Sequence, residues 1–64
     1  MAEATALYAY TALAPDELSF RRHECITVLG QDEEDEGWYC GRLSNDAVGF
    51  FPVNYVKIPT LSLY

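Results

Sequence analysis

The sequence predicts a small all-β protein, most simply a closed or nearly closed antiparallel barrel. The chain has only 64 residues, and its apolar residues lie in short β-type runs separated by turn residues. None of these runs keeps a helical period long enough to form a helix. Because an open sheet of this size would expose unpaired edges, we expect the sheet to close on itself. A chain this short buries only about 60% of its unfolded surface, so we expect one domain of modest stability.

The expected strands follow one another between turns and cover residues 5–10, 25–29, 38–43, 47–51 and 56–58. In the second strand the β-branched Ile26 and Val28 should face the same side. The first turn is predicted where Pro15 fixes φ and Asp16 offers a side-chain acceptor. Residues 44–46 predict a second tight turn, and Pro52 ends the fourth strand.

Alternating apolar side chains define the candidate core, which consists of Ala6, Leu18, Phe20, Ile26, Val28, Phe51 and Val56. Five consecutive carboxylates, residues 32–36, are typical of a solvated loop. Residues 59–64 fall outside the strand pattern, and we expect a linker there. The alternative is that the three apolar side chains of this tail dock on the barrel.

The charge balance excludes several classes of partner. Ten Asp and Glu residues against four Lys and Arg residues give a net charge of -6, which repels nucleic acid and anionic lipid headgroups. The apolar runs are far too short for a membrane helix, and the N-terminus lacks the features of a signal peptide. We therefore expect a cytoplasmic domain, associated with cytoskeleton or membrane only through a parent protein.

The inventory of reactive side chains predicts no enzyme, no metal and no cofactor. His23 is the only histidine, and the chain has no glycine-rich loop that could hold a phosphate. Cys25 and Cys40 with one histidine cannot complete a tetrahedral zinc site. We expect both cysteines to be reduced thiols, although a cross-strand disulfide is an open alternative.

The chain carries more aromatic residues than so small a core needs, namely Tyr8, Tyr10, Trp38, Phe50 and Tyr55. Tyr8 and Tyr10 are two positions apart and share a strand face with Ala6 unless the strand bends. These tyrosines are either large core residues with their hydroxyls at the rim or surface rings on a strand end that leaves the barrel. The residues alone leave both interpretations open.

Four segments in order resemble the Src homology 3 family. Residues 6–10 (ALYAY) look like the family's Ala-Leu-Tyr-Asp-Tyr signature, and residues 16–20 (DELSF) like its first acidic loop. Residues 37–39 (GWY) and 49–56 (GFFPVNYV) are similar to its Gly-Trp-Trp and Gly-x-x-Pro-x-Asn-Tyr-Val elements. The resemblance covers residues 5–58 and leaves 1–4 and 59–64 as tails. It implies a five-stranded, two-sheet antiparallel barrel with a short 3-10 turn before the last strand.

The resemblance also implies binding of proline-rich Pro-x-x-Pro peptides in the polyproline II conformation. Such a ligand is already ordered before it binds, and its proline rings pack between aromatic side chains. By resemblance, Tyr8 and Tyr55 line one proline pocket, and the second is lined by Tyr10, Trp38, Pro52 and Tyr55. The implied donors to peptide carbonyls are the Trp38 indole, the Asn54 amide and the Tyr55 hydroxyl. Phe50 lies beside the third pocket.

Acidic residues are expected to set the direction of the bound peptide. Glu17 occupies the position of the family carboxylate that pairs with a ligand Arg or Lys, and Asp16 is a plausible second partner. The run 32–36 is either a solvated loop or an extension of this acidic pocket, and we include its Glu34 among the binding residues. Exposed ion pairs contribute about 0–1 kcal/mol, so this run should change the association rate and salt dependence more than the affinity.

Four positions depart from the family pattern. Ala9 replaces an Asp, which removes an acceptor but no pocket wall, and Tyr39 replaces an exterior Trp. His23 replaces a common turn Gly, and a positive φ there would cost about 1 kcal/mol. Gly41 stands where a small apolar core residue is usual, and we expect Phe51 to fill the space.

We therefore expect a monomeric adaptor module that binds proline-rich segments of other proteins or of its own parent chain. Its interface should be small, under about 1,200 Å², and binding should be weak and transient. The alternative is an interaction or oligomerisation module of the same fold that uses an atypical ligand or another surface. A nucleic-acid-binding barrel would need basic residues among its aromatics, and the sequence has acidic ones instead.

Overall fold

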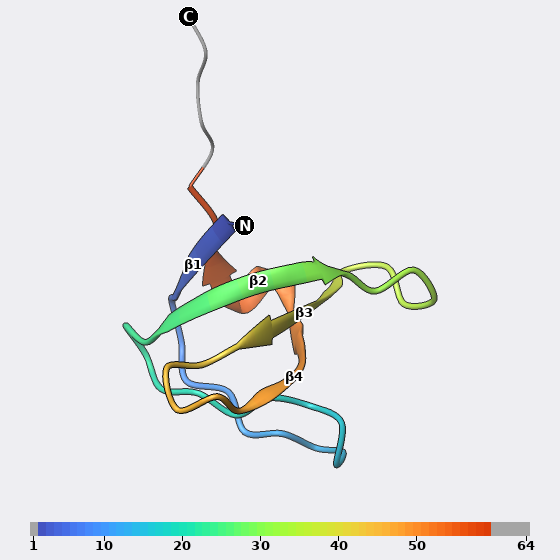
Figure 1. Ribbon diagram of the computed structural model, residues 1–64, viewed down its shortest axis with the longest axis horizontal. Helices are drawn as coiled ribbons and strands as arrows, with labels where there is room; N and C mark the ends of the chain where they lie inside the picture. The colour runs from blue at the N-terminus through green and yellow to red at the C-terminus, as the bar shows by residue number, and fades with distance from the viewer. Residues whose placement is uncertain (1, 60–64) are drawn as a thin grey trace, which may run out of the picture.

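Five antiparallel strands surround the core in the computed structural model, which describes residues 2–59. The strands are β1 (Ala2–Ala6), β2 (Cys25–Gln31), β3 (Trp38–Arg42), β4 (Val48–Pro52) and β5 (Val56–Lys57). A 3-10 turn, η1 (Val53–Tyr55), precedes β5. The predicted all-β class, the five antiparallel strands and the 3-10 turn are confirmed (Figure 1). No helix within residues 2–59 is long and apolar enough to cross a membrane.

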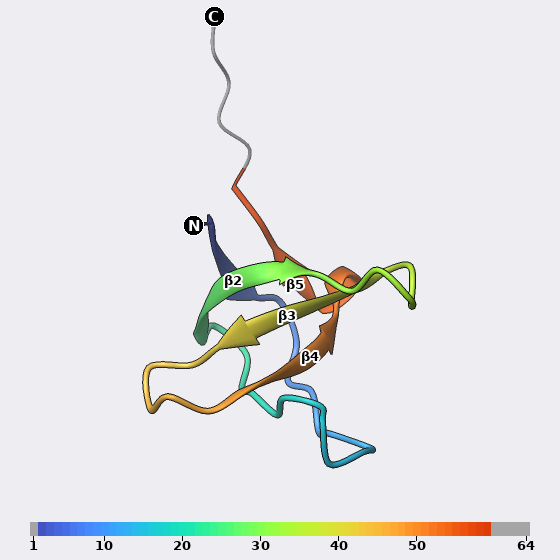
Figure 2. The same ribbon diagram turned by 45° about the vertical axis from the view of Figure 1, so that its right-hand side comes forward.

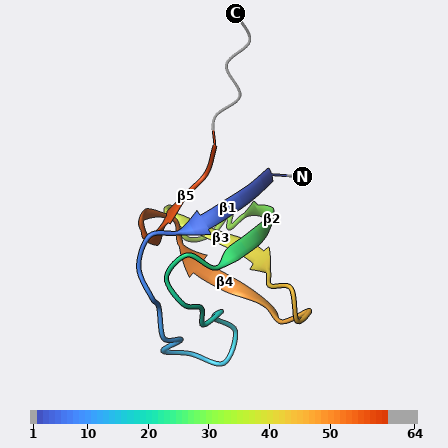
Figure 3. The same cartoon turned by 90° about the vertical axis from the view of Figure 1, so that its left-hand side faces the viewer.

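The strands are joined in the order β4-β3-β2-β1-β5. β2 belongs to both halves of the fold, because its first part pairs with β1 and its second part with β3. The register of β2 against β3 shifts between Val28 and Gly30, and such an irregularity increases the local twist. The sheet consequently curls around one core, with β1 beside β5 at one end and the β3–β4 hairpin at the other (Figures 2 and 3).

The core contains every residue that the alternation pattern predicted, together with Ala4 and Leu43. Phe51 is fully buried and meets Phe20 edge to face, with ring centroids 6.0 Å apart. Gly41 is also buried, and a Cβ there would lie 2.6 Å from Ile26 Cγ2 and 2.7 Å from Phe51 Cε1. Phe51 and Ile26 therefore fill the space that the missing side chain leaves, as the sequence predicted for Phe51.

The first strand differs from the prediction. It covers Ala2–Ala6 rather than residues 5–10, so residues 2–4, which we expected in a tail, pair with β2. Strand pairing explains the shift, because Ala4 lies opposite Ile26 and is completely buried. After Ala6 the chain turns away: the Leu7 N–H donates to the Tyr55 carbonyl at 2.8 Å. Tyr10 joins only an isolated bridge to Phe20.

The remaining strand boundaries shift by one or two residues from those predicted. Residues 18–20 alternate buried, exposed and buried as expected, but they do not form a strand, and only Phe20 among them joins an isolated bridge. Cys25 is exposed, Cys40 is half-buried, and both are free thiols, so the disulfide alternative is wrong for the described structure. The two predictions for the tail, a linker or a segment docked on the barrel, concern mainly residues 60–64. These residues lie outside the described residues.

His23 has a φ of 75°, so this turn does need the left-handed conformation that the sequence left conditional. Its N–H donates to the Ala6 carbonyl at 2.9 Å, and the Glu24 N–H donates to the Arg21 carbonyl at 3.1 Å. The turn 21–24 is therefore fastened to the end of β1. These hydrogen bonds hold His23 in its strained left-handed conformation.

Candidate functional site

Four aromatic rings stand side by side on one surface of the barrel. We call Tyr8, Tyr55, Tyr10 and Trp38 the aromatic strip. Tyr55 contacts Tyr8 and Tyr10 with centroids 5.9 Å and 5.1 Å apart, and Tyr10 contacts Trp38 at 6.3 Å. All three pairs are close to perpendicular, with interplanar angles of 83°, 72° and 75°. Rings packed edge to face present alternating faces and edges, an apolar surface with polar hydroxyl and N–H groups at its rim.

The surface position of these rings follows from the backbone. Because β1 ends at Ala6, Tyr8 leaves the strand face and is 60% exposed, which decides the open question in favour of a surface ring. Tyr10 is half-buried and packs against the core, so for this residue both interpretations hold in part. Trp38 begins β3, and Tyr55 ends η1.

Three further predicted residues come from β4 and η1. Pro52 lies opposite Trp38 in the β3–β4 ladder, and Asn54 is exposed in the middle of η1. Two backbone hydrogen bonds hold Phe50 against the first loop. Its N–H donates to the Asp16 carbonyl at 2.9 Å, and its carbonyl accepts a hydrogen bond from the Leu18 N–H at 2.8 Å. The loop can approach this closely because Gly49 has no side chain: a Cβ there would lie 2.9 Å from the Glu17 carbonyl carbon.

Glu17 is held at the edge of the aromatic strip by two hydrogen bonds. The Tyr10 hydroxyl donates to Glu17 Oε1 at 2.6 Å, and the Leu13 N–H donates to the same oxygen at 2.8 Å. The tyrosine bond, followed by the Leu13 bond, lowers the pKa of the Glu17 carboxyl below its ordinary value. The same bond raises the pKa of Tyr10 to about 12. At neutral pH the pair is therefore a carboxylate and a neutral phenol.

A small acidic hollow opens next to Trp38. Its volume is about 190 Å³, and we call its lining residues the acidic hollow: Asp16, Glu17, Asp32, Asp35, Trp38 and Phe50. Two backbone hydrogen bonds fold the acidic loop around the tryptophan. The Asp32 N–H donates to the Trp38 carbonyl at 2.9 Å, and the Trp38 N–H donates to the Asp35 carbonyl at 3.2 Å. Four carboxyl groups thus line one hollow beside one indole ring.

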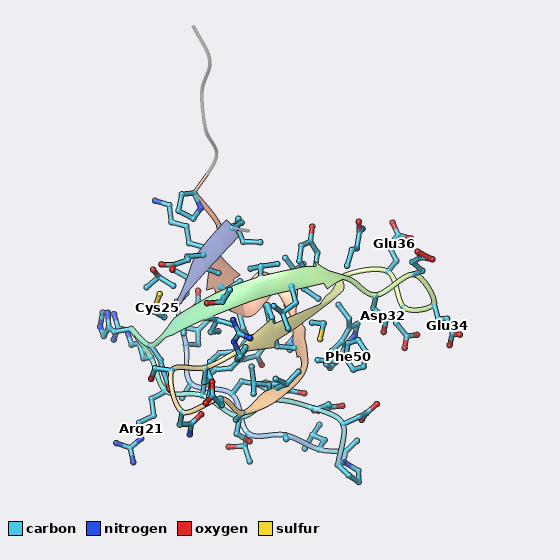
Figure 4. All side chains as sticks on the ribbon, viewed as in Figure 1. Arg21, Cys25, Asp32, Glu34, Glu36 and Phe50 are labelled. Atoms are coloured by element: carbon cyan, nitrogen blue, oxygen red, sulfur yellow. The ribbon has the colours of Figure 1, made fainter. Side chains whose placement is uncertain are left out.

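Glu34 is not part of this hollow. Its side chain is exposed, and its N–H donates to Asp32 Oδ1 at 3.0 Å, which closes a short turn in the loop. Figure 4 shows Glu34 toward the outer end of the loop. The loop conformation therefore selects Asp32 and Asp35, rather than Glu34, as neighbours of Trp38.

Comparison with protein families supplies an identity that agrees with this geometry. A family model described as the variant SH3 domain matches residues 6–57. The chain belongs to the SH3 domain family. SH3 domains are interaction modules without catalytic activity of their own that bind proline-rich peptides.

Curated relatives of this SH3 domain are much longer proteins. Mitogen-activated protein kinase kinase kinase 10 of Mus musculus is 46% identical over 55 residues, which cover 81% of this chain and 6% of the relative. Protein kinase C and casein kinase substrate in neurons protein 1 of Bos taurus is 43% identical over 53 residues, covering 83% of this chain and 12% of the relative. The chain thus spans a small part of the curated relatives it matches.

Solved SH3 domains share the fold over nearly all of the chain. The C-terminal SH3 domain of myosin IB from Entamoeba histolytica, solved with a bound EhFP10(GEF) peptide, superposes with a TM-score of 0.81 at 44% identity. That match covers 92% of this chain and 93% of the other. The SH3 domain of a hypothetical 40.4 kDa protein from S. cerevisiae has a TM-score of 0.79 at 32% identity, covering 92% of this chain and all of the other.

The structure brings nearly all the predicted site residues of this SH3 domain onto one continuous surface. The four rings contact one another in series, Pro52 pairs with Trp38, and the acidic hollow joins Trp38 to Phe50, Asp16 and Glu17. Sequence reasoning did not single out Asp32 and Asp35 from five adjacent carboxylates. It also missed the close approach at Gly49, for which the only signal was the glycine itself.

Proposed function

We propose that this SH3 domain binds Pro-x-x-Pro peptides across the aromatic strip and uses the acidic hollow to bind an Arg or Lys beside the prolines. Tyr8 and Tyr55 form the first proline pocket, and Tyr10, Trp38, Pro52 and Tyr55 form the second. The Trp38 indole, the Asn54 amide and the Tyr55 hydroxyl donate to peptide carbonyls. The flanking Arg or Lys is contacted by Phe50, Asp16 and Glu17, and Glu34 attracts it at longer range.

The observation that carries this proposal is that Trp38 belongs to both the aromatic strip and the acidic hollow. The indole contacts the Tyr10 ring, with centroids 6.3 Å apart, and it also lines the hollow that holds four carboxyl groups. A hollow of about 190 Å³ is smaller than a whole-ligand pocket and has room for about one long side chain. An Arg or Lys that enters it meets carboxylates and can stack on the indole.

Glu17 is suited to fix the orientation of that basic side chain. Within residues 2–59 both of its hydrogen bonds fall on Oε1, so Oε2 remains for a ligand. The lowered pKa keeps the group charged. The partner is thus a proline-rich segment of another protein or of the parent chain, bound weakly by a cytoplasmic monomer that serves as an adaptor in signalling or at the cytoskeleton.

A titration of the isotope-labelled domain with a Pro-x-x-Pro peptide that carries one flanking Arg tests the proposal. We expect fast-exchange shifts at the aromatic strip, Glu17 and Asn54. Trp38→Ala should abolish binding while the strand signals persist, and Trp38→Phe, which keeps a ring but loses the N–H donor, should bind with intermediate affinity. Unchanged affinity in Trp38→Ala would exclude the aromatic strip as the binding surface.

A further inference from the structure

A second and larger hollow lies on another part of the domain, away from the acidic loop. It measures about 790 Å³ and opens where the base of the first loop, the turn 21–24 and the end of the β3–β4 hairpin meet. We call the residues that define it the basic groove: Tyr10, Phe20, Arg21, Arg22, His23 and Leu43. In Figure 4, Arg21 and the acidic residues Asp32, Glu34 and Glu36 lie at opposite sides of the molecule.

The basic groove concentrates the positive charge of an acidic protein. Arg21 and Arg22 are two of only four Lys and Arg residues in a chain of net charge -6, and His23 is the only histidine. Glu24 is the one carboxylate among the lining residues, and its Oε1 accepts the backbone N–H of Arg21 at 2.9 Å. The backbone of the turn fixes this carboxylate, which keeps its charge, so the groove holds two arginines against one carboxylate. The Arg21 guanidinium points away from the barrel (Figure 4).

The two arginines and His23 lie on a turn, residues 21–24, that hydrogen bonds to β1 make rigid. The Ala6 N–H donates to the Glu24 carbonyl and the His23 N–H donates to the Ala6 carbonyl, both at 2.9 Å, so the turn is bonded to β1 on both sides. His23 keeps a φ of 75° in this turn. Backbone strain of this kind is concentrated at sites where a fixed geometry serves a function. A rigid turn loses little conformational entropy when its side chains bind a ligand.

The floor of the groove is apolar. Tyr10 and Phe20 exchange two backbone hydrogen bonds of 2.9 Å, and their rings lie 5.9 Å apart. Leu43 closes the floor from the hairpin side. The hollow is open and shallow rather than enclosed, so it suits the side chains of an extended segment lying on the surface.

We propose that the basic groove is a second peptide-binding site, which takes an extended acidic segment that carries apolar side chains. Asp or Glu side chains of the segment pair with the two guanidinium groups, which match carboxylates in geometry as well as charge. An apolar side chain between them rests on the Tyr10–Phe20–Leu43 floor. The acidic loop of a second copy offers charge, but residues 32–36 contain no apolar side chain. The chemistry therefore favours an acidic segment of a different protein.

The probe for the test is the peptide Glu-Asp-Leu-Glu-Asp-Leu-Glu-Asp, titrated into the isotope-labelled domain. We expect shifts at the amides of residues 10, 20–24 and 43–45. In the double variant Arg21→Gln, Arg22→Gln the affinity should fall about tenfold, since two charge pairs are lost. The double variant Arg42→Gln, Lys57→Gln has the same net charge and alters residues outside the groove, and it should bind as the unmodified domain does.

Three outcomes would overturn the proposal. Equal losses in the two double variants would mean that net charge, rather than the groove, attracts the peptide. Equal binding of a peptide with Ser in place of both Leu residues would remove the role of the apolar floor. Line broadening that grows with protein concentration in the absence of peptide would assign the groove to a second copy. The Trp38→Ala variant should bind the acidic peptide normally, so this proposal and the proline-rich site fail independently.

Discussion

The Tyr10 hydroxyl donates a 2.6 Å hydrogen bond to Glu17 Oε1, and this bond joins the aromatic strip to the acidic hollow. The Tyr10 ring packs against Tyr55 on one side, with centroids 5.1 Å apart, and its hydroxyl holds the carboxylate on the other. The residue proposed as a wall of the second proline pocket and the residue proposed to bind the flanking cation are thus joined by one hydrogen bond. A peptide that fills the pocket meets a carboxylate already in position.

The pH dependence of binding should report this bond. The pKa of Glu17 is lowered from the ordinary value of 4.5, chiefly by Tyr10. Its charge is therefore present above the ordinary value and is lost only as the pH falls through the lowered one. In Tyr10→Phe the main cause of the shift is gone, so affinity for an Arg-flanked peptide should begin to fall at a higher pH.

Calorimetric titrations of both proteins between about pH 3 and pH 6 would measure this difference. Asp16, Asp32 and Asp35 are common to both proteins, so the difference between the two curves isolates Glu17. A peptide without Arg or Lys is the control, and its affinity should change equally in both. Superimposable curves for the Arg-flanked peptide would show that the Tyr10 bond does not set the charge of Glu17 during binding.

Within the acidic loop, the carboxylates that line the acidic hollow should contribute more to peptide affinity than those that do not. Asp35→Asn removes a carboxylate that lines the acidic hollow, and Glu34→Gln removes the exposed carboxylate of the preceding residue, with the same change in net charge. We expect Asp35→Asn to weaken an Arg-flanked peptide about threefold, as for one partly exposed ion pair, and Glu34→Gln to have little effect beyond a lower association rate. Stopped-flow and equilibrium titrations separate the two. A larger equilibrium loss in Glu34→Gln would favour the residue that the sequence suggested.

Relief of the backbone strain at His23 should stabilise the domain. His23→Gly removes the cost of a side chain at φ 75° and should raise the free energy of unfolding by about 1 kcal/mol. His23→Ala is the matched control, because it also loses the imidazole but keeps the Cβ. Urea unfolding curves decide the matter. If alanine stabilises as much as glycine, the imidazole rather than the backbone is the destabilising group.

Gly41, the fourth residue of β3, should not tolerate even a methyl side chain. A Cβ at Gly41 would overlap Ile26 and Phe51, both fully buried, so Gly41→Ala should destabilise by about 1–3 kcal/mol through overpacking. Gly30→Ala is the control, since nothing lies within 4 Å of a Cβ there. Thermal unfolding followed by circular dichroism compares the two. Equal effects would mean that strand propensity, not space, governs both positions.

The sequence predicted the core better than it predicted the first strand, for a physical reason. Alternation marks which side chains are buried, and Ile26, Val28 and Phe51 were identified in this way. The start of β1 is rich in alanine, which has low strand propensity, so pairing with β2 rather than local preference places it. Leu7 and Tyr8 have strand-like composition but are diverted by the bond to η1.

The site was predictable in its residue types and less so in its loops. The aromatic strip follows from motif positions that the fold holds at fixed places. Five similar carboxylates in a row contain no local signal for which of them face inward. Which carboxylates face inward depends on the backbone hydrogen bonds that Asp32 and Asp35 make with Trp38. The basic groove could not be seen either, because it forms only when the turn 21–24 meets the β3–β4 hairpin.

The pairing of β1 with β5 has a mechanical consequence. The strands are antiparallel, so a pull on the two ends of the domain acts on the same end of this pair. Tension would peel β5 from β1 one bond at a time rather than shear all bonds together. Within residues 2–59 the resistance comes from two residue pairs, Thr5 with Lys57 and Ala6 with Val56, and from the adjoining hydrogen bond between the Leu7 N–H and the Tyr55 carbonyl. Tyr55 directly precedes β5, so a stretched parent chain would dismantle the aromatic strip before the β2–β3–β4 meander gives way, and ligand release would respond to force.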